Sequence, residues 1–195
     1  MPRPNMKEQR RVEILEAFEN CVARYGVEGA TLERTAGEAG LARALIRHNV
    51  GNRDDLLAAL IERFFDRSAH DMGQMIAALP VQNRSRTLVD WLFDPTFSDP
   101  KQVLITEALI AAAANDKALA NRLKSWTNDF VGSIESVLQQ GFPNASTESI
   151  AAVGAGITGI YFNIDSFALL GPMKKLRAAS KAAALRLVDS LENEK

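Results

Sequence analysis

Apolar residues recur at every third or fourth position along most of the chain, which is the spacing of one buried helical face. The first such stretch runs from Lys7 to Tyr25 and stops at Gly26. Its apolar positions are Ile14, Leu15, Phe18, Cys21, Val22 and Tyr25. No stretch alternates apolar and polar residues in the way that a half-buried strand does. The pattern therefore predicts an all-α protein.

Residues 31–57 are predicted to form two short helices, a tight turn between them, and the start of a longer helix. Thr31 can cap the first helix, because its hydroxyl can accept a hydrogen bond from an amide one turn further on. Gly40 stands where a helix commonly ends in a left-handed residue. The second helix, around Ala42 to Asn49, and the residues that flank it offer four candidates for its buried side: Leu41, Leu45, Ile46 and Val50. Two helices joined in this way, the second of them basic, predict a helix-turn-helix.

The longer helix is predicted to begin after Asn52, an N-cap, with Asp54 and Asp55 at its positive end. An apolar stripe then leads to about Ala78 and consists of Leu56, Leu57, Leu60, Ile61, Phe64, Phe65 and Met72. This helix would belong to both halves of the molecule. Beyond Pro80, helix breakers delimit further helices over 87–93, 101–114, 117–140, 147–170 and 172–191. About nine helices are expected in all.

Composition favours an ordinary globular protein, with 47% hydrophobic and 24% charged residues in 195. The formal charge is −1, but residues 1–53 carry nine Lys/Arg against seven acids, a net of +2, and the remainder carries −3. One cysteine excludes an internal disulfide, and two histidines are too few for the usual zinc site, so no metal or cofactor is expected. The longest apolar run, Ala108 to Ala114, is too short to cross a bilayer, and the N-terminus lacks a signal-peptide pattern. We expect a cytoplasmic protein without a membrane partner, with a disordered arm over Met1 to Asn5 that carries Arg3.

The run from Ile14 to Leu57 resembles the N-terminal domain of the TetR (tetracycline-repressor-like) regulators. The order is apolar helix, glycine, Thr-initiated helix, the turn Ala39-Gly40-Leu41, recognition helix, short polar turn and Leu-Leu. Thr35 stands where an aliphatic residue is usual, and Ala42 where a Ser or Thr cap is usual. The resemblance implies a helix-turn-helix DNA-binding domain over residues 1–53. It also implies a larger helical domain over 54–195 that binds an effector and dimerises.

A transcriptional regulator of this kind, most often a repressor, would bind double-stranded DNA at a palindromic operator as a homodimer. Each subunit would place residues 42–49 in a major groove. Arg43 and Arg47 are expected at base edges or phosphates, since the basic residues gather here. The predicted DNA-binding residues are Thr31, Arg43, Ala44, Arg47, His48, Asn49 and Arg53.

The predicted helix 147–170 is rich in small residues that let another helix approach closely, among them Ala151, Ala152, Gly154, Ala155, Gly156 and Gly159. Together with the final Ala-rich helix, it would pair with the two-fold copy as a four-helix bundle. The alternative is that these small residues pack inside one subunit.

An unidentified small-molecule effector, largely apolar, is expected in the C-terminal domain. The candidate pocket residues are Met72, Trp91, Trp126, Phe130, Tyr161, Phe162 and Asp165. An aromatic stripe at helical spacing also suits a plain core. The DNA would be released if the effector favours a conformation in which the two DNA-binding domains of the dimer are wrongly spaced.

Two other functions stay open: a DNA-binding protein controlled by a protein partner, and a helical ligand carrier or enzyme that binds no DNA. The residues Gly154-x-Gly156-x-x-Gly159 spell the dinucleotide-binding fingerprint, but within a predicted helix and with no preceding strand. A nucleophile elbow and a phosphate-binding glycine loop are absent from the sequence. An enzyme is therefore not expected.

Overall fold

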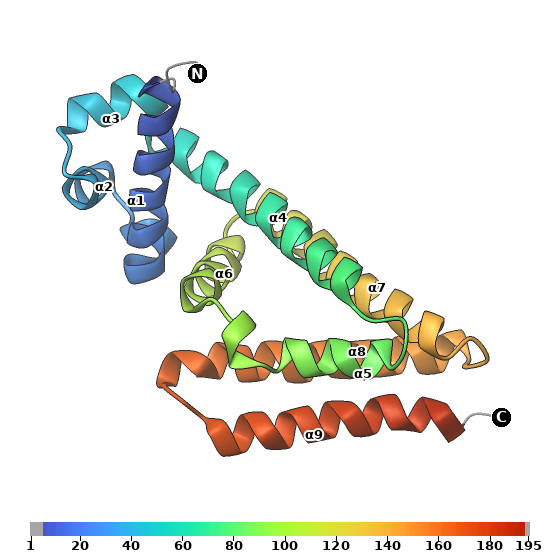
Figure 1. Cartoon of the computed structure of the whole chain (residues 1–195). Coiled ribbons are helices and arrows are strands. Elements are labelled where there is room, and N and C mark those ends of the chain that lie inside the picture. The colour runs from blue at the N-terminus through green and yellow to red at the C-terminus, as the bar shows by residue number, and fades with distance from the viewer. Residues whose placement is uncertain (1–5, 194–195) are drawn as a thin grey trace, which may run out of the picture. The chain divides into compact units, whose positions relative to one another are not determined.

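The computed structural model of the chain describes residues 6–193, and within them it contains nine α-helices, three short 3-10 helices and no strand (Figure 1). The α-helices are α1 (Met6–Gly29), α2 (Leu32–Ala39), α3 (Arg43–Val50), α4 (Arg53–Ala78), α5 (Arg84–Leu92), α6 (Pro100–Ala113), α7 (Lys117–Gly141), α8 (Thr147–Phe167) and α9 (Lys174–Ser190). The 3-10 helices are η1 (Pro95–Phe97), η2 (Ala168–Leu170) and η3 (Leu191–Asn193). The predicted all-α fold is confirmed. The predicted arm at Met1 to Asn5, with Arg3, lies outside the described residues.

Two helix boundaries differ from the sequence prediction for identifiable reasons. α5 begins at Arg84 and not at Thr87, and the polar side chains of Arg84, Ser85 and Arg86 all have hydrogen-bond partners there. The Arg84 guanidinium donates to the carbonyls of Leu79 (2.9 Å) and Ile76 (2.8 Å), at the end of α4. The predicted last turn of α8 narrows to the 3-10 helix η2, which ends at Gly171 with φ 105°.

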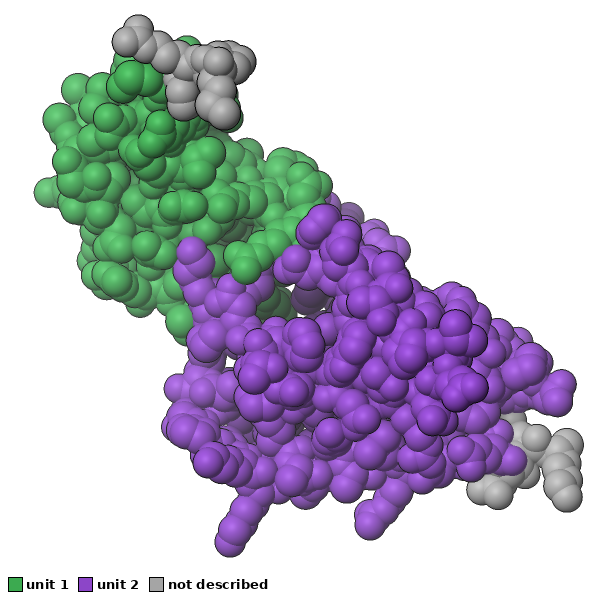
Figure 2. Space-filling view, in the orientation of Figure 1, with its two compact units in different colours: residues 1–68, 104–120 green, residues 69–103, 121–195 purple. Residues whose placement is uncertain are grey.

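The chain forms two compact units (Figure 2). Unit 1 contains residues 1–68 and 104–120, and unit 2 contains residues 69–103 and 121–195. The chain therefore passes between the units three times, and α4, α6 and α7 each contribute residues to both. The predicted functional boundary after residue 53 stays a prediction.

The core of unit 1 is built where α1 packs against α2 and α3 (Figure 1). The buried residues of these helices and of the first half of α4 include Ile14, Phe18, Val22, Ile46, Leu56, Leu60 and Phe64. Two residues predicted to be buried are exposed: Tyr25 by 49% and Leu45 by 39%. Tyr25 instead lies beneath the Arg34 guanidinium, 4.5 Å from the ring centroid, at the point where Gly26 (φ 70°) turns the chain. α3 has only two turns, so one side chain, Ile46, anchors it, while Leu41 and Val50 are partly buried.

The core of unit 2 is formed by α5, α7, α8 and α9, with α9 packed against α8 and α5. Glycines of α8 permit close packing inside this unit. A Cβ at Gly156 would lie 2.8 Å from Leu187 Cδ1, and a Cβ at Gly154 would lie 2.8 Å from Glu135 Cγ. The alternative of packing within one subunit therefore accounts for these two positions. Ala151, Ala155 and other small residues of α8 stay exposed, however.

The segment 147–170 is long and apolar enough, by length and composition, to cross a membrane. No uninterrupted apolar run of the sequence has this length, because polar residues such as Thr158, Asn163 and Asp165 divide the segment. Ile150, Val153, Ile157 and Ile164 of this segment are buried in the core of unit 2. Burial in this core accounts for only part of the segment, because 28% of its apolar window is buried.

Candidate nucleic-acid interface

The turn between α2 and α3 has the geometry that the sequence predicts. Thr31 is extended (φ −94°, ψ 158°), and its hydroxyl accepts a hydrogen bond from the Arg34 amide at 3.2 Å. Gly40 is left-handed (φ 64°, ψ 30°), and the next amide, of Leu41, donates to the Ala36 carbonyl at 2.9 Å. A residue with a Cβ would be strained at this φ. The left-handed conformation of Gly40 therefore fixes the turn between α2 and α3.

α3 is held to unit 1 by the fully buried Ile46, which leaves its other face in solvent. Arg43, Ala44, Arg47 and His48 are exposed, and they lie within two successive turns of one helix side. Within residues 6–193, the side chains of Arg43, Arg47 and His48 make no hydrogen bond or ion pair. This face thus presents two guanidinium groups and an imidazole whose donors are all available to a partner.

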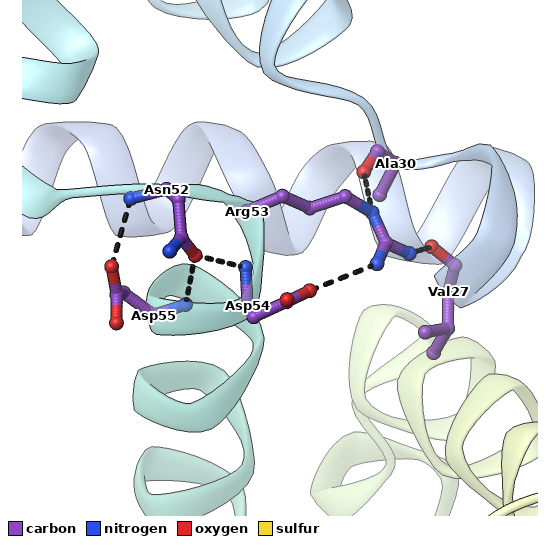
Figure 3. Close-up of polar contacts among 6 residues, drawn as sticks. All are labelled: Val27, Ala30, Asn52, Arg53, Asp54 and Asp55. Atoms are coloured by element: carbon purple, nitrogen blue, oxygen red, sulfur yellow. Dashed lines mark hydrogen bonds and ion pairs between the residues drawn. The ribbon is translucent and has the colours of Figure 1, made fainter.

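The junction between α3 and α4 is fastened by a reciprocal cap, drawn in Figure 3. The Asn52 side-chain oxygen accepts from the amides of Asp54 (2.7 Å) and Asp55 (3.0 Å). The Asp55 carboxylate accepts in return from the Asn52 amide at 2.8 Å. Gly51 precedes this cap with φ 88°, and a Cβ there would lie 2.3 Å from the Asp55 Oδ2 atom. The predicted Asn52 cap is confirmed, and Gly51 is a required part of it.

Arg53 connects this junction to the end of α1 (Figure 3). Its Nε donates to the Ala30 carbonyl at 3.0 Å and its Nη2 donates to the Val27 carbonyl. Its Nη1 lies 3.7 Å from the Asp54 carboxylate. The sequence suggested a phosphate contact for Arg53; the structure shows a guanidinium engaged by backbone carbonyls. A charged donor is well suited to the carbonyls at a helix end, which have few partners within the helix.

Polar contacts also hold α2 to α1. Asn20 and Arg24 of α1 donate to the Glu38 carboxylate of α2 at 3.1 and 3.0 Å. Thr35 is fully buried, and its hydroxyl donates to the Thr31 carbonyl at 2.9 Å. A hydroxyl at this usually aliphatic position is therefore tolerated, because it has a partner one turn back. The same Thr35 lies beside Cys21, whose thiol pKa is raised by burial.

The remaining predicted DNA-binding residues are placed differently from the exposed arginines. Thr31 is exposed, but its hydroxyl serves as the α2 cap. Asn49 is partly buried, and its amide donates to the Leu45 carbonyl within α3 at 2.8 Å. Ala42 is the N-cap of α3 and makes no side-chain cap hydrogen bond, as its methyl group requires. The structure thus brings Arg43, Ala44, Arg47 and His48 together as one outward face.

The predicted effector residues do not all meet in one place. Trp126, Phe130, Tyr161 and Phe162 form a cluster of rings in unit 2 with centroids 5.0–5.7 Å apart. Trp91 instead contacts Phe97 at 5.9 Å. Burial, followed by the negative charge of Asp165, raises the pKa of Tyr161 above its ordinary value. Of these four residues, Phe130 and Tyr161 pack against the core of unit 2.

The last two predicted effector residues have other surroundings. Met72 is partly buried on α4. Asp165 is buried and accepts a hydrogen bond from the Ser98 hydroxyl at 2.8 Å. Ser98, which follows η1, was not a candidate in the sequence analysis, because no local pattern places it beside a residue 67 positions away.

Comparison with known proteins finds relatives that are named as HTH-type transcriptional regulators. The chain is 35% identical over 86 residues to the HTH-type transcriptional repressor AcnR of Corynebacterium jeikeium, a match covering 43% of this chain and 45% of that protein. It is 23% identical over 197 residues to the HTH-type transcriptional regulator BetI of Vibrio vulnificus, covering 100% of this chain and 96% of that protein. The match to AcnR thus spans less than half the length of that relative. No family profile matches the chain.

Among solved structures, a TetR transcription regulator from Haloarcula marismortui superposes with a TM-score of 0.74 at 18% identity. The match covers 94% of this chain and 98% of that one. The fold and the α2–α3 geometry therefore define a helix-turn-helix protein. Its fold is that of the TetR-family regulators, and the predicted resemblance to that family is confirmed. Both relatives are named as HTH-type transcriptional regulators, in agreement with the prediction that this chain is not an enzyme.

Proposed function

We propose that the protein is a sequence-specific DNA-binding transcriptional regulator, acting in the cytoplasm as a repressor. The observation that carries this proposal is the outward face of α3. Two arginines stand four positions apart on an exposed helix side, with no acid on the same helix. The major groove admits one α-helix, and arginine binds guanine edges through two parallel hydrogen bonds.

The face is also built so that a helix backbone can approach DNA closely. Ala44 follows Arg43 in the first turn of α3, and its small side chain leaves room for the neighbouring groups to reach base edges. The Gly40 turn, the Ile46 anchor and the Asn52 cap together fix how α3 is presented. Rigid presentation matters because disordered side chains and loops must be ordered on binding, at a cost in affinity.

A homodimer on a palindromic operator is the assembly that we propose. One helix-turn-helix reads only a half-site, and dimers place two recognition helices about 34–36 Å apart or a multiple of this distance. The exposed small residues Ala151, Ala152, Ala155 and Gly159 support α8 as part of the dimer interface. Gly159 is the clearest case, because no atom lies within 4 Å of a Cβ built there, so the chain itself does not require glycine.

Control by a small-molecule effector bound in unit 2 completes the proposal. Its thermodynamic basis is that a ligand shifts a conformational equilibrium by its difference in affinity for the two states, typically about 1–3 kcal/mol. Support comes from the cavity described below. A protein partner in place of the effector is the competing proposal, and compounds that release DNA would decide between the two.

The test is selection of bound fragments from random duplexes, followed by gel-shift titration of the selected site. Arg47→Ala should weaken binding roughly five- to a hundredfold, since a bidentate contact to guanine contributes about 1–3 kcal/mol. Lys124→Ala is the control, because this exposed lysine of α7 in unit 2 removes the same charge away from α3. The stoichiometry of the titration should be two chains per duplex. Unchanged affinity of Arg47→Ala would contradict the assignment of the reading face.

A further inference from the structure

A cavity of about 250 Å³ lies in unit 2, where α8 ends and α9 begins. Six of its lining residues are apolar or glycine: Pro95, Ile164, Ala168, Gly171, Pro172 and Met173. The one charged residue in its wall is Arg177, on the first turn of α9. None of the seven effector residues predicted from the sequence lines this cavity. An apolar cavity with a single polar group is a common form of small-molecule site.

The Arg177 guanidinium is buried without enough acceptors. Its side chain is 15% exposed, and its Nη1 atom is fully buried with no hydrogen-bond partner within the described residues. A buried donor without an acceptor is costly, and in native structures nearly all such donors have partners. Arg177 therefore brings to the cavity wall a guanidinium group that lacks one acceptor.

The acids near Arg177 are occupied elsewhere. Asp165 lies 3.8 Å from Arg177 Nη2, too far for a hydrogen bond, and its Oδ1 already accepts from the Ser98 hydroxyl. Asp94, at the start of η1, accepts from both the amide and the hydroxyl of Thr96 at 2.8 and 2.7 Å. These carboxylates compensate the charge of Arg177 at a distance but leave its Nη1 without an acceptor.

We propose that this cavity binds a small organic carboxylic acid, with the carboxylate on Arg177 and a short apolar body against the remaining wall. A guanidinium is matched to a carboxylate, because its planar N–H groups can form two parallel charge-assisted hydrogen bonds. The cavity volume corresponds to roughly eight molecules of liquid water, which limits the ligand to a compact acid. That this acid is the effector rests on the proposed function, whereas its binding does not.

The first experiment compares benzoate with benzamide by calorimetry on the full chain without DNA. The two probes have nearly the same shape, but only benzoate carries a charge. Benzoate should bind at least about tenfold more tightly, because hydrogen bonds between ionised groups are stronger than neutral ones. Equal affinity for the two probes would overturn the carboxylate assignment. Absence of binding of both probes at millimolar concentration would overturn the site.

Two variants locate the binding site. Arg177→Met should abolish the preference for benzoate over benzamide. Lys181→Met is the matched control, since Lys181 lies one turn further along α9, pairs with Asp90 at 2.8 Å and does not line the cavity. An equal loss in both variants would show general attraction of anions and overturn the proposal. Asp165→Asn should tighten benzoate binding, because it removes the opposing charge and keeps an oxygen for Ser98. If Arg177→Met does not fold, Asp165→Asn and the comparison of benzoate with benzamide on the unaltered chain still test whether the cavity binds a carboxylate.

The outcomes for this site and for the proposed function are distinguishable. Benzoate binding with no selected duplex would overturn the regulator proposal and leave the carboxylate site in place. Duplex binding without benzoate binding would overturn the carboxylate site alone. When both bind, benzoate should lower the affinity for the selected duplex in the unaltered chain and not in Arg177→Met.

Discussion

Replacing Arg53 by Met separates a structural role of this residue from a phosphate contact. Met keeps most of the apolar stem and removes the guanidinium that donates to the carbonyls of Val27 and Ala30. Hydrogen bonds to charged donors contribute about 1.5–3 kcal/mol each. The side chain is 28% exposed, so water can replace part of what is lost, and the sum must be reduced. We expect Arg53→Met to lower the free energy of unfolding of unit 1 by about 2 kcal/mol.

Two measurements are needed, one for stability and one for DNA binding. Both tryptophans, Trp91 and Trp126, lie in unit 2, so their fluorescence does not report on unit 1. Urea unfolding followed by circular dichroism, with hydrogen exchange of α1 and α4 amides, measures unit 1 instead. The salt dependence of binding to the selected duplex then counts phosphate contacts, because each contact contributes about 0.9 to the slope of log K against log salt.

If Arg53 has a structural role, Arg53→Met should lower the hydrogen-exchange protection of the α1 and α4 amides. The salt slope of duplex binding should then stay unchanged. The opposite pair of results, unchanged stability and a slope smaller by about one, would refute this reasoning and restore the phosphate contact. Arg53→Lys is an informative second variant. Lysine keeps the positive charge but has one nitrogen in place of the branched guanidinium group. Arg53→Lys should therefore recover the salt slope of any phosphate contact, but only part of the stability that Arg53→Met loses.

Two further predictions concern local conformation and burial. Gly51→Ala should destabilise the chain by about 1–3 kcal/mol, because its φ of 88° is left-handed and the added Cβ would meet the Asp55 carboxylate. Gly73→Ala, in α4 with no atom within 4 Å of the new Cβ, should stabilise by about 0.5–1 kcal/mol in the same urea experiment. Burial raises the pKa of Tyr161, so the unfolded chain loses this proton first, and stability should fall as pH rises above about 10. Tyr161→Phe should remove that fall in urea unfolding at pH 9 to 11, and an unchanged profile would mean that Tyr161 ionises normally when folded.

Local rules were sufficient for the helix-turn-helix. The Thr31 cap, the left-handed Gly40 and the Asn52 cap each depend on residues within four positions, so the sequence contains all of their partners. The exposure of Arg43 and Arg47 follows from the two-turn length of α3 and one apolar anchor. Helical periodicity likewise gave the number and type of the helices, and its errors fell at helix ends.

Contacts between distant segments were decided only by the tertiary structure. Arg53 looked like one more basic residue near a phosphate backbone, and the fold places it against carbonyls 23 and 26 positions earlier. Tyr25 and Leu45 fit an apolar stripe but lie at the edge of a small core that has no room for them. The cavity at Arg177 brings Pro95 together with residues from 164 to 177, a juxtaposition that no local pattern encodes. Helix propensity and capping act within one turn of the chain, whereas the partners of a buried charge are fixed only when distant helices pack together.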